Sequence, residues 1–276
     1  MIRNTTLCAL MALSVASAAL AAPRPHTRHG RSRPPRETVL EQTLDRVVEL
    51  RREKRSPTVI FDLDDTLFAV APRTRRIFSD WAAHLPAQYD RYRSAFQKLD
   101  PDTMPYDPEK VLDLAGLSDP LLRRSAMRQW HLFFFSNRYL REDRPAAGAR
   151  SFLDRLRHAK ARIVYLTGRD QLRMGLGTID QIREAGFPPV DNARVLLMLK
   201  PDKRMSDLAF KERALADIRA RGTVVAGFDN EPANVNLFKR HFPDAIIVHL
   251  DTVYSAKAPG LDPGISRIRD FLPGRP

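Results

Sequence analysis

The chain has 276 residues, of which 43% are hydrophobic, and a formal net charge of +13 at pH 7. This length is enough for one sizeable α/β domain with an insertion, and the composition is that of an ordinary globular protein. The only cysteine is Cys8, which excludes a fold held together by internal disulfides. The positive charge favours anionic partners, which include polyanions, anionic surfaces and small anionic substrates.

The first 21 residues have the features of a secretory signal. Arg3 is the only charge before an apolar run from Leu7 to Leu20, which closes with the small-residue triplet Ala19-Leu20-Ala21. The run is rich in alanine and shorter than the roughly 20 residues that span a bilayer, which favours cleavage over a membrane anchor. We therefore expect an exported protein, periplasmic or secreted, that has no membrane attachment after signal cleavage.

A basic segment follows the predicted signal. Residues 22–36 are rich in arginine and proline and contain no acid, a pattern that predicts an extended, solvated linker. A nucleic-acid-binding or membrane-surface arm is the alternative, but the segment lacks interleaved aromatic residues, so we expect no nucleic-acid partner. An amphipathic helix completes the segment 22–56, because apolar residues recur at helical spacing at Leu40, Leu44, Val47 and Val48.

Three carboxylates then follow a strongly apolar strand. The β-branched and aromatic run Thr58–Phe61 predicts a strand buried on both faces, and it leads into Asp62, Asp64 and Asp65. Because side chains of a strand alternate, Asp62 and Asp64 leave it on the same side. Two carboxylates on one side repel each other, so the pair calls for a metal cation or a shared proton.

The pattern of apolar residues changes between residues 70 and 145, where they recur at helical spacing and no strand is predicted. We expect an all-helical cap there, broken in its middle by Pro101, Pro105 and Pro108. Its Phe133-Phe134-Phe135 triplet fits the core of the cap, or its seam with the main domain, better than a cofactor site. The basic run formed by Arg73, Arg75 and Arg76 fits a solvated face better than a site for a second anionic group.

Strands and helices alternate regularly after the cap. The predicted strands are 162–166, 195–199, 223–228 and 245–248. This alternation predicts a three-layer, Rossmann-like α/β core with a parallel sheet, made of residues 57–69 and 146–270. Ligands of such sheets bind beyond the carboxyl ends of the strands, so Asp62, Asp64, Thr167 and Asp229 are expected in one crevice.

The motifs at these strand ends resemble those of the haloacid dehalogenase superfamily. Asp62-Leu63-Asp64-Asp65-Thr66 resembles its first motif, Leu166-Thr167-Gly168-Arg169 its second, and Gly227-Phe228-Asp229-Asn230-Glu231 its fourth. The resemblance covers roughly residues 57–270, and a cap between the first and second motifs is a familiar variant. It implies a phosphatase, similar to the acid phosphatases, with a helical cap.

The roles of the first two aspartates can be argued from the chemistry of phosphoryl transfer. Asp62 is the candidate nucleophile, which would form an aspartyl-phosphate. Asp64 could act as the general acid for the leaving alcohol and then as the base for water. Dehalogenating members of the superfamily lack an acid at this position, because halide needs no proton, so Asp64 favours a phosphatase.

A magnesium site is expected at the same strand ends. Asp229 would complete it together with the Asp62 carboxylate and the Asp64 backbone carbonyl. The simpler alternative for Asp229 is a cap for the helix that follows Pro232. The fourth motif departs from the common pattern because Glu231 intervenes and Asn234 replaces an acid. Whether Asn230, Glu231 or Asn234 reaches the metal stays open.

The substrate phosphate is expected to lie against Thr167 and Gly168, at a helix entry, although Thr167 could be a simple helix cap. The resemblance also requires a lysine between the second and fourth motifs. Lys211 is preferred because family members place this lysine near the start of a helix. Lys200 follows a strand end and is the alternative, and Lys203 is a weaker third candidate.

Together these features predict an exported, Mg²⁺-dependent phosphohydrolase that cleaves a small phosphomonoester through an aspartyl-phosphate. Two other functions stay open: a phosphotransferase that uses the same site, and a non-catalytic protein of the envelope that binds anions. The sequence does not indicate the identity of the substrate or the oligomeric state.

Overall fold

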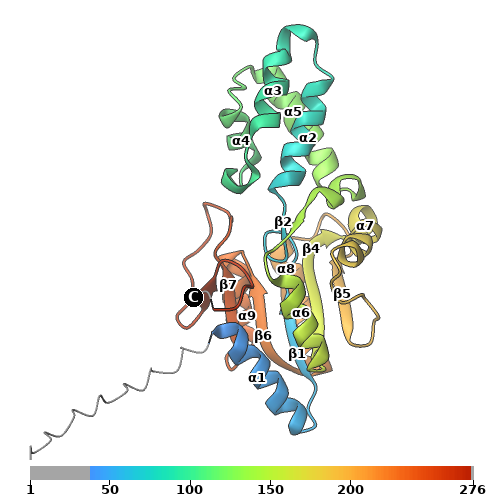
Figure 1. The fold of residues 1–276 in the computed structure, drawn as a ribbon, viewed down its shortest axis with the longest axis vertical. Coiled ribbons are helices and arrows are strands. Elements are labelled where there is room, and N and C mark those ends of the chain that lie inside the picture. The colour runs from blue at the N-terminus through green and yellow to red at the C-terminus, as the bar shows by residue number, and fades with distance from the viewer. Residues whose placement is uncertain (1–37, 275–276) are drawn as a thin grey trace, which may run out of the picture. The chain divides into compact units, whose positions relative to one another are not determined.

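The computed structural model describes residues 38–274, so the predicted signal and the basic linker up to residue 37 lie outside the described range. A six-stranded parallel sheet forms the centre of this part of the chain, in the order β5-β4-β1-β6-β7-β8 (Figure 1). The strands are β1 (Pro57–Phe61), β4 (Arg162–Asp170), β5 (Val195–Lys200), β6 (Thr223–Asp229), β7 (Ile246–Leu250) and β8 (Ser266–Ile268). The predicted parallel α/β fold is confirmed. β8 is not among the predicted strands, because it has only three residues and one of them is buried.

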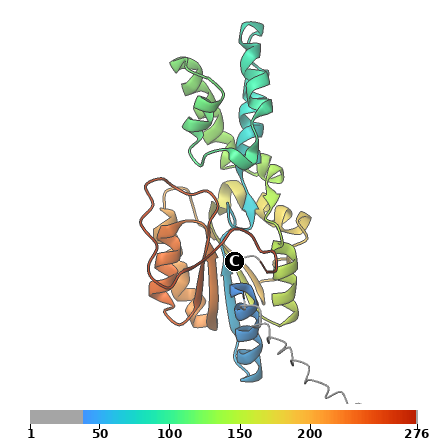
Figure 2. The same cartoon turned by 60° about the vertical axis from the view of Figure 1, so that its left-hand side comes forward.

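Helices cover both faces of the sheet and give the predicted three layers (Figures 1 and 2). Because side chains alternate along β1, Val59 and Phe61 pack into the hydrophobic cluster on one face and Ile60 into the cluster on the other. The first face carries α1 (Val39–Arg52), α6 (Ala149–His158) and part of α7 (Gln171–Glu184), and the second carries α8 (Asp207–Arg221) and α9 (Pro232–His241). No helix within residues 38–274 is long and apolar enough to cross a membrane.

A helical insertion separates β1 from α6 and lies beyond the carboxyl ends of the strands (Figure 1). Its own core contains Phe78, Trp81 and Phe96, with the rings of Phe78 and Phe96 5.3 Å apart. Its elements are α2 (Ala71–Ala83), η1 (Ala87–Tyr89), α3 (Asp90–Lys98), η2 (Pro101–Thr103), α4 (Pro108–Leu114), α5 (Pro120–Phe134) and η3 (Asn137–Glu142). The expectation of a helical cap is therefore met by this insertion.

Two details of the insertion differ from the prediction. Where the chain enters and leaves it, β2 (Phe68–Ala69) pairs antiparallel with β3 (Arg144–Pro145), and two-residue strands are too short to show an alternating pattern. Pro101 and Pro108 begin helical segments instead of only interrupting them, since proline lacks an N–H that the first helical turn does not need. Asp107 caps α4, with its side chain accepting a hydrogen bond from the backbone N–H of Glu109.

The order of the strands places a crevice at the end of β1. The chain passes from β1 to β4 on one side, and it later returns to β6 on the other side of β1. β1 is therefore the point at which the strand order reverses, and loops diverge there on either side. The first acidic motif lies at this position, directly after Phe61.

Candidate active site

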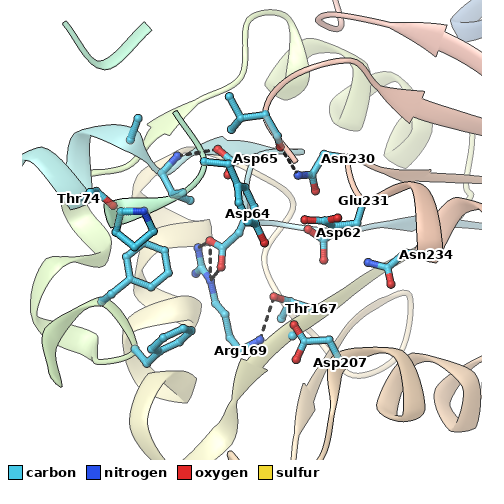
Figure 3. A pocket seen from close by; sticks show the side chains of 18 of the residues that line it. Asp62, Asp64, Asp65, Thr74, Thr167, Arg169, Asp207, Asn230, Glu231 and Asn234 are labelled. Carbon is cyan, nitrogen blue, oxygen red and sulfur yellow. Dashed lines mark hydrogen bonds and ion pairs between the residues drawn. The ribbon is translucent and has the colours of Figure 1, made fainter. Parts of the chain in front are cut away.

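A cavity of about 250 Å³ lies beyond the carboxyl end of β1 (Figure 3). One side consists of polar residues at the strand ends, and the other consists of apolar residues of the insertion. The predicted site residues that line it are Asp62, Asp64, Thr167, Gly168 and Lys211. Asp229 lies directly behind them and is completely buried. The structure thus brings together residues that are up to 167 positions apart in the sequence.

Lys211 joins the two predicted metal-binding carboxylates. Its Nζ lies 2.7 Å from Oδ1 of Asp62 and 2.6 Å from Oδ2 of Asp229, and all three side chains are buried. Burial and the neighbouring Asp229 raise the pKa of Asp62, and the Lys211 ammonium opposes this by stabilising the carboxylate. When Asp62 and Asp229 are both ionised, one ammonium balances only one of the two carboxylates, which leaves negative charge for a further cation.

The other two candidate lysines are elsewhere. Nζ of Lys200 pairs with Asp207, and Lys200 does not line the cavity. Lys203 is exposed on the segment that follows β5. Of the three candidates, only Lys211 therefore contacts Asp62.

Asp64 is held by two arginines, which the sequence did not indicate. Its Oδ1 accepts hydrogen bonds from Arg169, at 2.6 Å, and from Arg73, at 2.9 Å. Burial alone would raise the pKa of Asp64, but the ion pairs with Arg169 and Arg73 outweigh it and hold that pKa well below its usual value. In this arrangement Asp64 is a carboxylate, which is the form that a general base needs.

Arg73 is completely buried, although the sequence favoured a solvated face for it. Its Nε donates to Oδ1 of Asp143 at 2.8 Å, and its guanidinium carbon lies 4.5 Å from the ring centre of Phe134. Arg75 and Arg76 are not part of the cavity: Arg75 donates to the carbonyl of Leu99, and Arg76 pairs with Asp80. The single buried arginine of the run therefore links the insertion to Asp64.

Asp143 and Gln181 complete this buried network. Nε2 of Gln181 donates to Oδ2 of Asp143 at 2.8 Å, and Oε1 of Gln181 accepts from Arg169 at 2.7 Å. Asp143 also lies 3.3 Å from Arg169. Asp143 gave no signal in the sequence, because the run Arg141-Glu142-Asp143-Arg144 has two acids between two arginines and resembles a solvated turn.

Thr167 lies within β4 and is not a helix cap. Its Oγ1 accepts a hydrogen bond from the backbone N–H of Arg169 at 3.3 Å, and only 1% of the residue is exposed. The N-cap of α7 is Asp170, whose side chain accepts from the N–H of Arg173 at 3.0 Å. The prediction that a helix begins at Thr167 is therefore wrong, because β4 continues to Asp170 and α7 begins at Gln171.

The three residues left open in the fourth motif all line the cavity. Asn234 donates to Oδ1 of Asp229 at 3.1 Å, and the backbone N–H of Glu231 donates to the same oxygen at 2.9 Å. Asn230 instead donates to the carbonyl of Val253 at 2.7 Å. The N-cap of α9 is Glu231, so Asp229 is not the cap residue itself.

Asp65 shapes the turn after β1. Its φ angle is +54°, in the left-handed region, and its Oδ1 accepts a hydrogen bond from the N–H of Val70 at 3.1 Å. The backbone carbonyl of Asp65 accepts from the hydroxyl of Thr252 at 2.7 Å. Burial raises the pKa of this carboxyl to about 7.

The residues present fit a magnesium ion. Mg²⁺ prefers oxygen ligands and is usually held by one or two carboxylates, with waters and substrate phosphate completing the shell. Asp62 and Asp229 supply two carboxylates whose charge Lys211 only half balances. No cluster of three or more histidine, cysteine, aspartate or glutamate side chains placed to hold a metal ion occurs within residues 38–274.

Comparison with known proteins gave structural matches only, since no protein-family model and no curated protein matches the chain. A haloacid dehalogenase-like hydrolase from Burkholderia xenovorans is 18% identical, with a TM-score of 0.45, over 79% of this chain and 94% of that one. A protein described as a phosphatase from Clostridium difficile is 11% identical, with a TM-score of 0.47, over 74% and 89% of the two chains. CbbY from Rhodobacter sphaeroides, in complex with phosphate, is 13% identical, with a TM-score of 0.44, over 79% and 95%.

These similarities concern the arrangement of the chain.

Proposed function

We propose that the chain is a Mg²⁺-dependent phosphohydrolase of the haloacid dehalogenase superfamily that cleaves a phosphomonoester. The observation that carries this proposal is the contact of Lys211 with both Asp62 and Asp229 at the carboxyl ends of adjacent strands. This arrangement provides a nucleophile and a cation for the phosphate oxygens in one small cavity.

The nucleophile is Asp62. Lys211 occupies its Oδ1, and Oδ2 has no hydrogen-bond partner among the described residues, so Oδ2 is the oxygen available for attack. Attack on phosphorus forms an aspartyl-phosphate and breaks the ester P–O bond, and the alcohol departs with a proton. Water then attacks the same phosphorus, releasing inorganic phosphate and restoring the Asp62 carboxylate.

The other residues position and neutralise the phosphate. Thr167 and Gly168 line the same cavity as Asp62 and offer a hydroxyl and a backbone N–H to phosphate oxygens. Lys211 stabilises negative charge on Asp62 and on the phosphate. Asp62, Asp229 and the backbone carbonyl of Asp64 would hold Mg²⁺, which would supply further charge neutralisation.

Asp64 serves the proton transfers in this proposal. The ion pairs with Arg169 and Arg73 lower its pKa and favour the carboxylate, which is the form that can take the proton of the attacking water. Donation to the leaving alcohol requires that Asp64 first gain a proton, which its pairing with Arg73 and Arg169 opposes.

The test measures phosphate release from phenyl phosphate by the wild-type protein and by Asp62→Asn. We expect activity with Mg²⁺ that is lost on adding EDTA, regained with excess Mg²⁺, and absent from Asp62→Asn. Lys200→Met is the matched control, because Lys200 is a basic residue at a strand end outside the cavity. Activity that survives both EDTA and Asp62→Asn would reject the proposal.

Export is a separate part of the proposal and rests on residues 1–21 alone. If the signal is cleaved, the N-terminal residue of the protein recovered outside the cytoplasm follows residue 21. Recovery of the chain with Met1 still present would reject cleavage.

A further inference from the structure

The insertion contributes an apolar wall to the cavity. Its lining residues are Ala71, Thr74, Met104, Pro105, Tyr106, Pro108, Trp130, Phe134 and Phe135. Three of the aromatic rings are packed together: Trp130 stacks on Phe134 at 4.5 Å between ring centres and meets Phe135 edge-on at 5.9 Å. A ligand held by the polar strand ends would place its remaining part against this wall.

The few polar groups of the wall already have partners. The indole N–H of Trp130 donates to Oγ1 of Thr74 at 3.1 Å. The hydroxyl of Tyr106 interacts with the carboxylate of Glu231 across the cavity, and burial together with this contact raises the pKa of Tyr106. A ligand hydroxyl or amide held against the rings of the wall would lose its water without gaining a partner from the insertion, which costs binding free energy.

The wall also lacks a cation for a second anionic group. No lysine, arginine or histidine of the insertion lines the cavity, as far as residues 38–274 are concerned. The nearest arginines are already paired: Arg73 and Arg169 with Asp64, and Arg173 with Asp170. The carboxylates of Asp207 and Glu231 also line the cavity and would repel a further negative charge.

We infer that the substrate is a phosphomonoester whose leaving group is uncharged and largely apolar, and that Trp130, Phe134 and Phe135 recognise it. This inference rests on the proposed function, because that function requires the substrate to be a phosphate ester. It disfavours sugar phosphates, because their hydroxyls would be unpaired against the wall, and nucleotides, because their ribose and base edges would be unpaired as well. The cavity volume of about 250 Å³ limits the leaving group to a small one.

The test compares primary alkyl phosphates, whose leaving groups have similar intrinsic reactivity. We expect kcat/KM for 2-phenylethyl phosphate to exceed that for glycerol 3-phosphate, glucose 6-phosphate and adenosine 5′-monophosphate by at least about tenfold. Equal or higher kcat/KM for any of these three polar substrates would overturn the inference and leave the proposed phosphatase function intact.

A variant tests the wall directly. Phe135→Ala should lower the ratio of kcat/KM for 2-phenylethyl phosphate to that for glycerol 3-phosphate by about tenfold. Leu132→Ala is the matched control, since Leu132 lies in the last turn of α5, just before Phe135, is 65% exposed and does not line the cavity. An unchanged ratio in a folded Phe135→Ala protein would contradict the inference.

A binding measurement tests the inference without requiring hydrolysis, and so distinguishes it from the proposed function. Trp130 lies in the wall, so its fluorescence should respond to a bound, non-hydrolysable 2-phenylethylphosphonate. Half-maximal change should occur at a concentration at least about tenfold lower than with a glycerol phosphonate. If no phosphate ester is hydrolysed but this preference holds, the proposed function fails, whereas recognition of an apolar group by the wall stands. If the two phosphonates bind equally, the inference fails.

Discussion

Arg73 gives the sharpest test of the buried network that joins the insertion to the sheet. Its side chain is completely buried, as is that of Asp143, with which it pairs. Removing one partner of a buried ion pair costs roughly 3–5 kcal/mol, because the other charge is left without compensation. In Arg73→Met, Asp143 keeps Gln181 at 2.8 Å, and Asp64 keeps Arg169 at 2.6 Å. We therefore expect the lower end of this range, about 3 kcal/mol.

The measurement is the free energy of unfolding from urea denaturation of wild-type and variant proteins. Arg76→Met is the matched control, because it removes an arginine from the same helix whose ion pair with Asp80 is 55% exposed on the arginine side. A pair at the surface contributes at most about 1 kcal/mol. If Arg73→Met destabilises the protein no more than Arg76→Met does, the reasoning about the buried network is refuted.

A second variant, at Asp143, allows the interaction energy between Arg73 and Asp143 to be measured. Asp143→Asn alone leaves the Arg73 guanidinium buried with Asp64 as its only carboxylate partner. In the double variant Arg73→Met/Asp143→Asn, the buried charge that each single variant leaves behind is absent. The double variant should therefore be less destabilised than the sum of the two single variants, by more than about 1 kcal/mol. Simple additivity would show that the two side chains do not interact.

Three further predictions concern the site. Lys211→Met should lower the rate of phosphate release about 10²- to 10³-fold, whereas Lys200→Met should leave that rate within about threefold. Equal effects of the two substitutions would contradict the assignment of Lys211 as the lysine that serves the phosphate. Asn234→Ala removes a hydrogen bond to Asp229, so the Mg²⁺ concentration for half-maximal activity should rise about 10-fold or more. An unchanged Mg²⁺ concentration for half-maximal activity would show that this contact does not position the Asp229 carboxylate. Burial raises the pKa of Asp65 to about 7 in the folded protein, so the stability linked to its proton is present below the unfolded pKa of about 4 and is lost as the pH rises toward 7. In urea denaturation with EDTA, the free energy of unfolding of Asp65→Asn should therefore rise by roughly 2–3 kcal/mol relative to that of the wild type between pH 5 and pH 7. A difference in the free energy of unfolding that stays constant over this pH range would refute the raised pKa of Asp65.

Much of the core could be predicted because its signals are local. The apolar run of β1 followed by Asp62 and Asp64 indicates a buried strand with charge at its end, and the parallel topology then places Asp229 beside them. Lys211 could also be supported from spacing, since it shares a helical face with Ala214, Leu215 and Ile218, all of which are buried.

The partners of Asp64 could not be predicted in the same way. Arg73 and Asp143 are 70 residues apart, and neither belongs to a recognisable motif. One signal was present, because Arg73 lies four residues before the buried Ile77 and thus on the inner face of α2, whereas Arg76 is exposed. The identity of its partners depends on how the insertion returns to the sheet, and that is a property of packing over long distances.

The contact of Arg73 with Asp64 also links the insertion to the proposed chemistry. A carboxylate that faces two guanidinium groups does not hold a proton at neutral pH, yet the departing alcohol needs one. Arg169 belongs to β4 and is fixed by Gln181 and Thr178, whereas Arg73 belongs to the insertion. Arg73 is thus one of the two cations that hold Asp64 as a carboxylate, so the residue that fastens the insertion also lowers the proton affinity of Asp64.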